Sequence, residues 1–369
     1  MRILIDYRPA LRQRTGVGEY AHELASALKP TLTTGDSMVL FSSSWKDRLS
    51  PNVVPDVPII DARVPVTLLN LVWHRLEWPP IESLAGDVDV AHSMHPLLMP
   101  ARAAAQVVTI YDLYFLDHAA NTAAEIKRDY PALAASHSRR ADAVITISKY
   151  TASQIEDRLA VDPERITICP PGAPQWTPLD RYADDGPILF MGTIEPRKNV
   201  ETLLRAYALL VQRRPNAPPL VLAGKVTPAC AHLLKDLEVP VLAGRVKAVG
   251  YVSGSERERM YRDASMLVLP SLDEGFGIPA LEAMTIGLPV VASNRGALPE
   301  VVGDAGFLVD PGDAGALASA MERYLTQPEA TRHARDAGRQ RAKLFTWQAS
   351  ARSLTRAYGD AVERRRARR

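Results

Sequence analysis

The sequence has few cysteines and no excess of charge of either sign. Only Cys169 and Cys230 occur among 369 residues. Two cysteines are too few for a disulfide framework or a cysteine-rich zinc site, so a reducing cytoplasm is the expected location. The 44 lysines and arginines nearly balance 42 aspartates and glutamates, which leaves a formal net charge of +2. This balance excludes the strong overall positive charge typical of nucleic-acid binding, and no nucleic-acid partner is expected.

Long apolar segments are also missing. The first candidate strand, residues 2–6, is far shorter than the apolar core of a secretory signal peptide. The longest apolar run, residues 64–73, is interrupted by Pro65 and Asn70 and falls short of the ~20 residues that span a bilayer. The sequence therefore predicts no exported protein and no transmembrane helix.

Short apolar segments that alternate with helical patterns are present throughout the chain. With 47% hydrophobic and 23% charged residues, this alternation is typical of a soluble α/β protein built from βαβ units and parallel sheets. We predict strands at residues 2–6, 38–41, 88–92, 106–110, 143–147, 166–169, 188–191, 220–223, 246–250, 266–269, 290–292 and 306–309. Helices are expected at residues 19–28, 200–213 and 347–363, and from residues 255, 278, 314 and 331.

A dense cluster of prolines and turn residues at 170–178 divides the chain. We predict a Rossmann-like N-terminal domain over residues 1–178, on the acceptor side, and a Rossmann-like donor domain over residues 179–345. Residues 346–369 then form a final helix, for which a return to the N-terminal domain is one prediction. The basic end, residues 364–369, is expected to be a solvated tail, with a role at a membrane surface as the alternative.

The C-terminal domain carries the most informative segment, residues 270–284. It leaves a strand, turns on two glycines and enters a helix with a proline in its first turn. The amides of Phe276, Gly277 and Ile278 would then lie at a helix N-terminus and form an anion site.

Glu274 and Glu282 flank this turn and can reach one ligand from different elements. A carboxylate pair beside an anion site suits a ligand with hydroxyls at both ends and phosphate in the middle, such as a nucleotide sugar. The structural alternatives are a charge favoured by the helix dipole for Glu274 and an exposed helical residue for Glu282. Spacing alone does not decide between these interpretations.

Arg197 and Lys198 follow another strand and precede a helix. This pair can neutralise a diphosphate, and fixed cations can stabilise a departing nucleoside diphosphate without a metal. The alternative is a solvated helix start. Asp87 and Asp89 form an Asp-x-Asp pair, but they precede a strand, so we expect no metal site.

Candidates in the N-terminal domain follow its strands. Gly16, Val17 and Gly18 form a weak match to a dinucleotide fingerprint but suit a flexible loop whose amides close over phosphate. His92 and His95 follow one strand, and Tyr111, Asp112, Asp117 and His118 follow the next. Because ligands lie beyond the carboxyl ends of parallel strands, these side chains are expected to face a cleft between the two domains. A structural hydrogen-bonding role is the alternative for each histidine.

Together these segments resemble the retaining GT-B glycosyltransferases of family 4, in which mannosyltransferases and glucosyltransferases of bacterial polysaccharide assembly are common. The Glu-x7-Glu element carries most of the resemblance. The matching segments are residues 6–20, 148–150, 192–199, 274–282 and 287–292.

The resemblance implies a role for each matching residue. Arg197 and Lys198 bind the donor diphosphate, Glu274 holds hydroxyls of the donor sugar, and Glu282 holds the ribose. Gly16 to Gly18 close over the phosphates, while the amides of residues 276–278 contact sugar and phosphate. The implied reaction is metal-independent and retaining, with no protein nucleophile and no cofactor besides the nucleotide-sugar substrate.

The sequence departs from the family at one position. Many relatives carry His-Asp after the strand at 106–110, whereas this chain has Tyr111 and Asp112. Tyrosine is a poor base at neutral pH but can donate a hydrogen bond to a sugar hydroxyl. Either the donor sugar is held differently or catalysis is weaker, and Asp112 and His118 are the candidates to compensate.

The leading hypothesis is a cytoplasmic hexosyltransferase. The resemblance favours GDP-mannose over UDP-sugars as donor and a growing glycan or polyprenyl-linked oligosaccharide as acceptor, in the assembly of a cell-surface polysaccharide such as lipopolysaccharide. Residues 66–76 are candidates for contact with the acceptor or the bilayer surface, with an interior helix as the alternative. Two rival functions are an inactive nucleotide-sugar-binding partner subunit and a GT-B sugar-nucleotide epimerase.

Overall fold

The computed structural model describes residues 1–11, 16–117 and 130–369. The chain forms two compact units. Unit 1 comprises Met1–Gly172 with Thr346–Arg369, and unit 2 comprises Ala173–Phe345. The first division thus falls after Gly172, whereas the sequence predicted it at residue 178, and the last 24 residues belong to unit 1.

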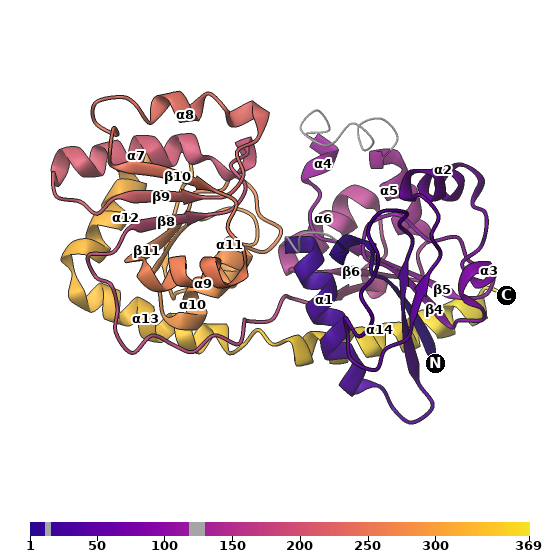
Figure 1. Ribbon diagram of the computed structural model, residues 1–369. Coiled ribbons are helices and arrows are strands. Elements are labelled where there is room, and N and C mark those ends of the chain that lie inside the picture. Colours follow the sequence, from indigo (N-terminus) through magenta and orange to yellow (C-terminus); the bar gives the residue numbers. More distant parts are fainter. Residues whose placement is uncertain (12–15, 118–129) are drawn as a thin grey trace. The chain divides into compact units, whose positions relative to one another are not determined.

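Unit 1 is built on a parallel sheet of seven strands in the order β3-β2-β1-β4-β5-β6-β7. Figure 1 labels β4, β5 and β6 of this sheet. The chain builds the sheet outward from β1 in one direction and then from β4 in the other, so the strand order reverses between β1 and β4. The strands are β1 (Arg2–Asp6), β2 (Ser37–Ser42), β3 (Ile59–Asp61), β4 (Val90–Ser93), β5 (Ala105–Ile110), β6 (Ala143–Thr146) and β7 (Ile166–Ile168).

Helices alternate with the strands of unit 1 along the chain. They are α1 (Gly16–Leu28), α2 (Val66–Leu76), α3 (Glu82–Ala85), α4 (Tyr114–Asp117), α5 (Tyr130–Arg140), α6 (Lys149–Leu159) and α14 (Trp347–Ala367). The last of these packs against α1 and against β5, β6 and β7. Its N-cap is Thr346, whose side-chain hydroxyl accepts a hydrogen bond from the amide of Ala349.

Unit 2 repeats the same design with six parallel strands in the order β10-β9-β8-β11-β12-β13. Its strand order reverses between β8 and β11. The strands are β8 (Ile188–Met191), β9 (Leu220–Ala223), β10 (Val246–Gly250), β11 (Met266–Leu269), β12 (Val290–Ser293) and β13 (Phe307–Val309). The helices are α7 (Val200–Arg213), α8 (Leu233–Asp236), α9 (Gly254–Asp263), α10 (Ile278–Ile286), α11 (Leu298–Val302), α12 (Ala314–Thr326) and α13 (Pro328–Ala342).

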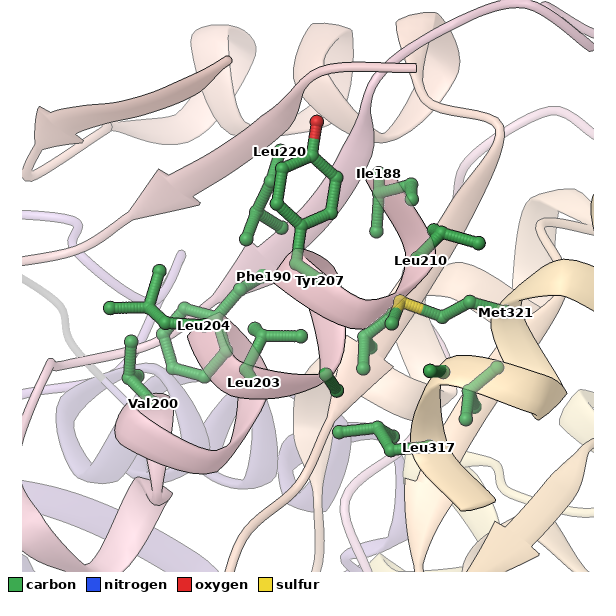
Figure 2. Packing of buried hydrophobic residues seen from close by; sticks show 14 of the residues in the cluster. Ile188, Phe190, Val200, Leu203, Leu204, Tyr207, Leu210, Leu220, Leu317 and Met321 are labelled. Carbon is green, nitrogen blue, oxygen red and sulfur yellow. The ribbon is translucent and has the colours of Figure 1, made fainter. Parts of the chain in front are cut away.

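One face of the unit 2 sheet is covered by α7 and α12, whose apolar sides form a common core. Figure 2 shows Phe190 and Leu220 of the sheet against Leu203 and Tyr207 of α7, with Met321 of α12 beside them. All five are buried. Because the first strand and first helix of the unit are locked together in this way, the loop between them has fixed ends.

The sequence predictions of fold class and strands are confirmed for both sheets. The sequence analysis missed β3, a three-residue strand too short to give a periodic signal. It also ended the last helix too early. Residues 364–367 continue α14, and Arg364 and Arg368 donate to the carbonyl and the carboxylate of Asp142, respectively. This end is therefore an anchored helix and not a tail without structure, while residues 366–369 are solvent-exposed as predicted.

Candidate functional site

The strand order of unit 2 places two loops side by side. In an open parallel sheet, the strand order reverses between two neighbouring strands. The loops that leave these two strands run in opposite directions, and ligands bind between them. Here these are the loop from β8, residues 192–199, and the loop from β11, residues 270–277. The amide of Leu272 donates to the carbonyl of Arg197 at 2.8 Å, which joins the two loops directly.

Asn199 fixes the end of the first loop. It adopts a left-handed conformation with φ of 55° immediately before α7. Its side-chain amide donates to the carbonyls of Pro270 and Pro311, at 3.0 and 2.8 Å. This residue was not singled out from the sequence, although an asparagine between a loop and a helix is a common signal for a special backbone conformation.

Glu274 is the centre of the charged cluster. Its side chain is buried, and Oε1 accepts hydrogen bonds from Lys198 Nζ at 2.5 Å and Ser271 Oγ at 2.8 Å. Arg197 Nη1 lies 3.7 Å from Oε2. Burial by itself would raise the pKa of Glu274, but the charges of Lys198 and Arg197 and these hydrogen bonds outweigh it, so the pKa is lowered and the group is ionised.

The positive charge at the site is balanced by negative charge. Arg197 also pairs with Glu195, whose Oε1 lies 3.0 Å from Nη2. Two cations thus face two carboxylates, and both cations retain N–H groups for another acceptor. The alternative of a solvated helix start does not describe Lys198, since only 12% of its side chain is exposed.

The turn that follows Glu274 depends on glycine. Gly277 has φ of +99° and is the N-cap of α10, and a Cβ at this position would lie 2.6 Å from Leu298 Cδ2. Ile278 is the first helical residue, and Pro279 follows it. Pro279 has no amide proton, and the amide of Ala280 donates to the carbonyl of Gly277 at 2.9 Å. The amides of Phe276, Gly277 and Ile278 precede these residues at the helix N-terminus, the kind of position where anions bind, and the anion site predicted there stays a prediction.

Glu282 is buried within α10 and is not the exposed helical residue of the structural alternative. The reason is that α10 is apolar on nearly every side and is therefore interior. Its Oε2 accepts a hydrogen bond from the hydroxyl of Tyr261 at 2.7 Å, and its Oε1 pairs with Arg257 at 2.8 Å. Sequence reasoning missed both partners because α9, which carries them, is distant along the chain.

The loop that follows β12, residues 294–297, also contacts Glu274. A Cβ at Gly296 would lie 2.5 Å from the amide nitrogen of Glu274, so only glycine fits this close approach. The amide of Ala297 donates to the carbonyl of Glu274 at 2.8 Å. The turn sequence at residues 293–296 was the available signal for this contact.

In unit 1, Gly16, Val17 and Gly18 are helical. They form the first turn of α1, and the expectation of a loop up to Glu19 is wrong for them. Gly18 is buried, with the carbonyl oxygen of Pro9 2.7 Å from where a Cβ would be, whereas Val17 is 40% exposed. The amides of this turn lie at a helix N-terminus, a position at which anions can bind, so phosphate binding here stays a prediction.

Tyr111 follows β5 and is held by neighbours within unit 1. Its hydroxyl donates to the carbonyl of Met94 at 3.2 Å, and its ring makes an edge contact with Tyr20 at 5.3 Å between centroids. Burial and the charge of Asp6 raise the pKa of Tyr111 above its ordinary value, so it is no base. Asp112 accepts the amide of Tyr114 at 3.2 Å. His118 lies outside the described residues.

A further charged group stands where the strand order of unit 1 reverses. Asp6 ends β1, and its fully buried carboxylate pairs with Arg8 at 2.7 Å and lies 3.4 Å from His95 Nε2. Burial opposes ionisation, but Arg8 and His95 together hold the pKa of Asp6 well below its ordinary range. The sequence analysis gave Asp6 and Arg8 no role, although an acidic residue that ends a buried strand was a usable signal.

His92 is a structural residue. Its Nδ1 is 2.6 Å from Tyr358 Oη and its Nε2 is 2.8 Å from Thr109 Oγ1, and the side chain is fully buried. Burial lowers the pKa of His92 to about 3. The hydrogen-bonding alternative therefore holds for this histidine, and the expected position beside a ligand is wrong.

Acidic and histidine side chains do not converge on a metal-binding arrangement anywhere in the described ranges. Asp89 instead accepts the amide of Arg2 at 2.7 Å, at the amino end of the sheet. Among the helices of those same ranges, none combines the length and apolar character needed to cross a bilayer.

The fold and the site define a class: an α/β protein of two Rossmann-like units, with a buried charged cluster and a helix N-terminus where the strand order of unit 2 reverses. The family model of glycosyl transferases group 1 matches residues 178–341, and that of glycosyltransferase family 4 matches residues 14–174. Since the two matches follow each other along most of the chain, the protein belongs to glycosyltransferase family 4.

Curated relatives come from several bacteria. The chain is 37% identical to the O-antigen chain mannosyltransferase B of Escherichia coli over 208 residues, which cover 56% of this chain and 54% of the relative. It is 33% identical to the MMP alpha-(1->4)-mannosyltransferase of Mycolicibacterium hassiacum over 232 residues, 61% of this chain and 56% of the relative. The chain therefore spans about half the length of the curated relatives it matches.

Solved structures share the fold across nearly the whole chain. Sucrose-phosphate synthase from Thermosynechococcus elongatus superposes with a TM-score of 0.76 at 23% identity, over 97% of this chain and 98% of that one. WaaG, a glycosyltransferase involved in lipopolysaccharide biosynthesis, gives a TM-score of 0.71 at 16% identity over 96% and 98%. At these identities the likeness supports the GT-B fold.

Proposed function

We propose that this protein is a retaining, metal-independent hexosyltransferase that uses a nucleoside diphosphate sugar. The observation that carries the proposal is the cluster of Lys198, Arg197 and Glu274 at the strand-order reversal of unit 2, beside the N-terminus of α10. It brings cations for a diphosphate together with a carboxylate for sugar hydroxyls. Cleavage of the sugar–phosphate bond leaves negative charge on the departing diphosphate, and fixed cations and amides stabilise that charge.

Each carboxylate has a separate task in this proposal. Glu274 is ionised and already accepts from Ser271, so it is prepared to accept donor-sugar hydroxyls while Lys198 turns to the phosphate. Glu282 is held in one orientation by Tyr261 and Arg257 and accepts the ribose hydroxyls through the lone pairs that these partners leave. In unit 1, the helix N-terminus at Gly16 to Gly18 is likewise proposed to bind phosphate.

Mannose is the favoured sugar, with GDP-mannose as donor. The support is the similarity to mannosyltransferases of Escherichia coli and Mycolicibacterium hassiacum. A UDP-sugar is the alternative. HepE from Anabaena, which superposes on this chain with a TM-score of 0.69, was solved in complex with UDP and glucose.

A growing glycan or a polyprenyl-linked oligosaccharide is the proposed acceptor, in the cytoplasm at the inner face of the membrane. Helix α2 supports peripheral contact, because Leu68, Leu71 and Leu76 are more than half exposed on it. Exposed leucines on an amphipathic helix suit an interfacial position.

Donor binding tests the site. In a thermal-shift panel of GDP, UDP and ADP with and without their sugars, GDP and GDP-mannose should raise the melting temperature, because ligands that bind only the folded state stabilise it. Lys198→Ala and Glu282→Ala should abolish the shift. Lys235→Ala and Glu329→Ala, at exposed positions of the same unit, are the matched controls. If no nucleotide shifts the parent, the donor site is wrong.

The reaction itself needs a separate experiment. Parent enzyme, GDP-mannose and mannosyl acceptors are incubated with EDTA, and the product is examined by NMR. An α-linked mannoside is expected, since the donor is α-linked and the reaction retains that configuration. A β-linked product contradicts retention, loss of activity in EDTA contradicts metal independence, and a converted nucleotide sugar without acceptor identifies an epimerase. Donor binding without turnover of any acceptor indicates an inactive partner subunit.

A further inference from the structure

Unit 1 contains a charged cavity away from the carboxyl ends of its strands. Its volume is about 650 Å³. Gln106, at the start of β5, lies in its wall, and the residues before β5 and β6 complete that side, so the cavity opens at the amino ends of the strands. Five arginines line it, together with one glutamate: Arg102, Arg139, Arg140, Arg365, Arg368 and Glu77.

The carboxylates nearby compensate only two of these arginines. Glu77 binds Arg140 through two parallel hydrogen bonds of 2.5 and 2.8 Å. Asp142 accepts Arg368 at 3.1 Å. In the part of the chain that the structure describes, no carboxylate pairs with the remaining three arginines: Arg102, Arg139 and Arg365.

Two of these three guanidinium groups are held by backbone carbonyls. Arg365 Nη2 donates to the carbonyls of Ala101 and Arg102, at 3.3 and 3.2 Å, and Arg139 Nη1 donates to that of Leu159 at 3.4 Å. Arg365 Nε is buried and has no partner among the described residues. The charges are therefore positioned by the fold, and one N–H donor in the wall is unused.

Positive charges also cluster next to the cavity. Arg165 donates to the carbonyl of Arg139 at 2.8 Å. Burial and then the charges of Arg368 and Arg364 lower the pKa of Arg165, and nearby aspartates only partly oppose them. A bound anion would relieve this repulsion. A merely solvated basic face would not need arginines anchored around a cavity.

We propose that this cavity is an anion site, separate from the donor site, that binds a phosphate monoester or diphosphate group. Arginine forks match phosphate oxygens in pairs, and a cavity of about 650 Å³ is larger than one phosphate group needs. Trp78, which is 62% exposed, stands at its wall and can cover the group that carries the phosphate. That group is either a free phosphorylated molecule or the headgroup of an anionic lipid.

The test uses the full chain and inorganic pyrophosphate, with Trp78 fluorescence and calorimetry as readouts. The parent should bind pyrophosphate with a change in fluorescence that disappears in Trp78→Phe. Arg102→Ala/Arg365→Ala should weaken binding at least about tenfold, because several charge-assisted hydrogen bonds are lost. The matched control is Arg352→Ala, which removes an exposed arginine of α14, the helix that carries Arg365. This variant should bind pyrophosphate like the parent.

Pyrophosphate can also enter the donor site, so Lys198→Ala is titrated in parallel. It should keep the Trp78 signal while losing any second binding event, which separates failure of one site from failure of the other. Equal Trp78 signals in the parent and in the double arginine variant, with both folded by circular dichroism, would overturn the proposal.

Vesicles distinguish the two sources of phosphate. Phosphatidylcholine vesicles with and without phosphatidic acid are sedimented with each variant. Binding that requires both phosphatidic acid and the arginines identifies a lipid headgroup, whereas pyrophosphate binding alone identifies a free ligand. If the parent binds neither pyrophosphate nor phosphatidic acid vesicles, there is no anion site.

Discussion

At the scale of single residues, the stability of the donor cluster rests on the partners of one buried carboxylate. Lys198→Ala removes the nearest cation from Glu274 and leaves Arg197 at 3.7 Å. We expect the free energy of unfolding to fall by about 3 kcal/mol, since an uncompensated buried charge is costly. Urea titration measures the loss. Lys198→Ala/Glu274→Ala should recover part of it, and a single variant as stable as the parent would contradict this account.

The same carboxylate predicts a pH dependence. Its pKa is lower in the folded protein than its ordinary value of 4.5, so the unfolded chain binds the proton first. The contribution of Glu274 is complete above about pH 4.5 and is lost as the pH falls through the folded pKa. Glu274→Gln should therefore flatten the decline of unfolding free energy between about pH 5 and pH 3 in urea titrations. An unchanged slope would show that Glu274 titrates alike in both states.

Tyr111 provides a test of a family position. Because its hydroxyl donates to the carbonyl of Met94, Tyr111→Phe should lower the free energy of unfolding by about 1 kcal/mol. The rate of sugar transfer should stay within about twofold of the parent, which corresponds to a difference of about 0.4 kcal/mol in activation free energy. Melting temperature and initial rates with saturating donor give the two quantities. A tenfold loss of rate with unchanged stability would instead show that the hydroxyl binds the donor sugar.

At the scale of elements, two glycines in helices have opposite roles. Gly277→Ala forces a side chain into a left-handed N-cap against Leu298 and should cost about 1–2 kcal/mol and weaken donor binding. Gly359 lies inside α14 with open space around it, so Gly359→Ala should stabilise by about 0.5–1 kcal/mol. Denaturant titration of both variants checks the pair. Equal effects would show that the α10 start is not strained by a side chain.

Nearly all the strands and several helices were predictable from local patterns, whereas α3, α4, α5, α6, α8 and α11 were not predicted. The strand at 188–191 and the helix at 200–213 were predicted with their observed bounds, because a short apolar run and an amphipathic repeat are both local signals. The start of α1 and the end of α14 were misjudged. In both places helix length depends on packing within unit 1, such as the close approach of Gly18 to Pro9, which no local pattern contains.

At the scale of the whole molecule, we expect buried histidines to make unit 1 sensitive to acid. Burial lowers the pKa of His92 to about 3 and, together with neighbouring positive groups, lowers those of His74 and His137 to about 4. The unfolded chain protonates histidine near pH 6.5, so it binds more protons below that value. Stability from these groups is complete above about pH 6.5 and declines toward pH 4.

Limited proteolysis with peptide mapping checks this prediction at about pH 7.5 and about pH 5. Cleavage within residues 1–172 should increase at the lower pH more than cleavage within residues 173–345. The unfolded protein, digested at both values, corrects for the pH dependence of the protease. Equal increases in both units would show that the histidines do not set the acid sensitivity.

The sequence by itself determined the fold class, nearly all the strands and the residue types of the donor cluster, because periodicity, glycine turns and charge spacing are local properties. Tertiary structure alone decided which side chains meet. Lys198 and Glu274 lie 76 residues apart in sequence and meet because β8 and β11 are neighbours in the sheet. The arginines of α14 line a cavity only because that helix packs on the sheet of unit 1. A linear pattern cannot specify such partners, since each depends on strand order and on which helix covers which face.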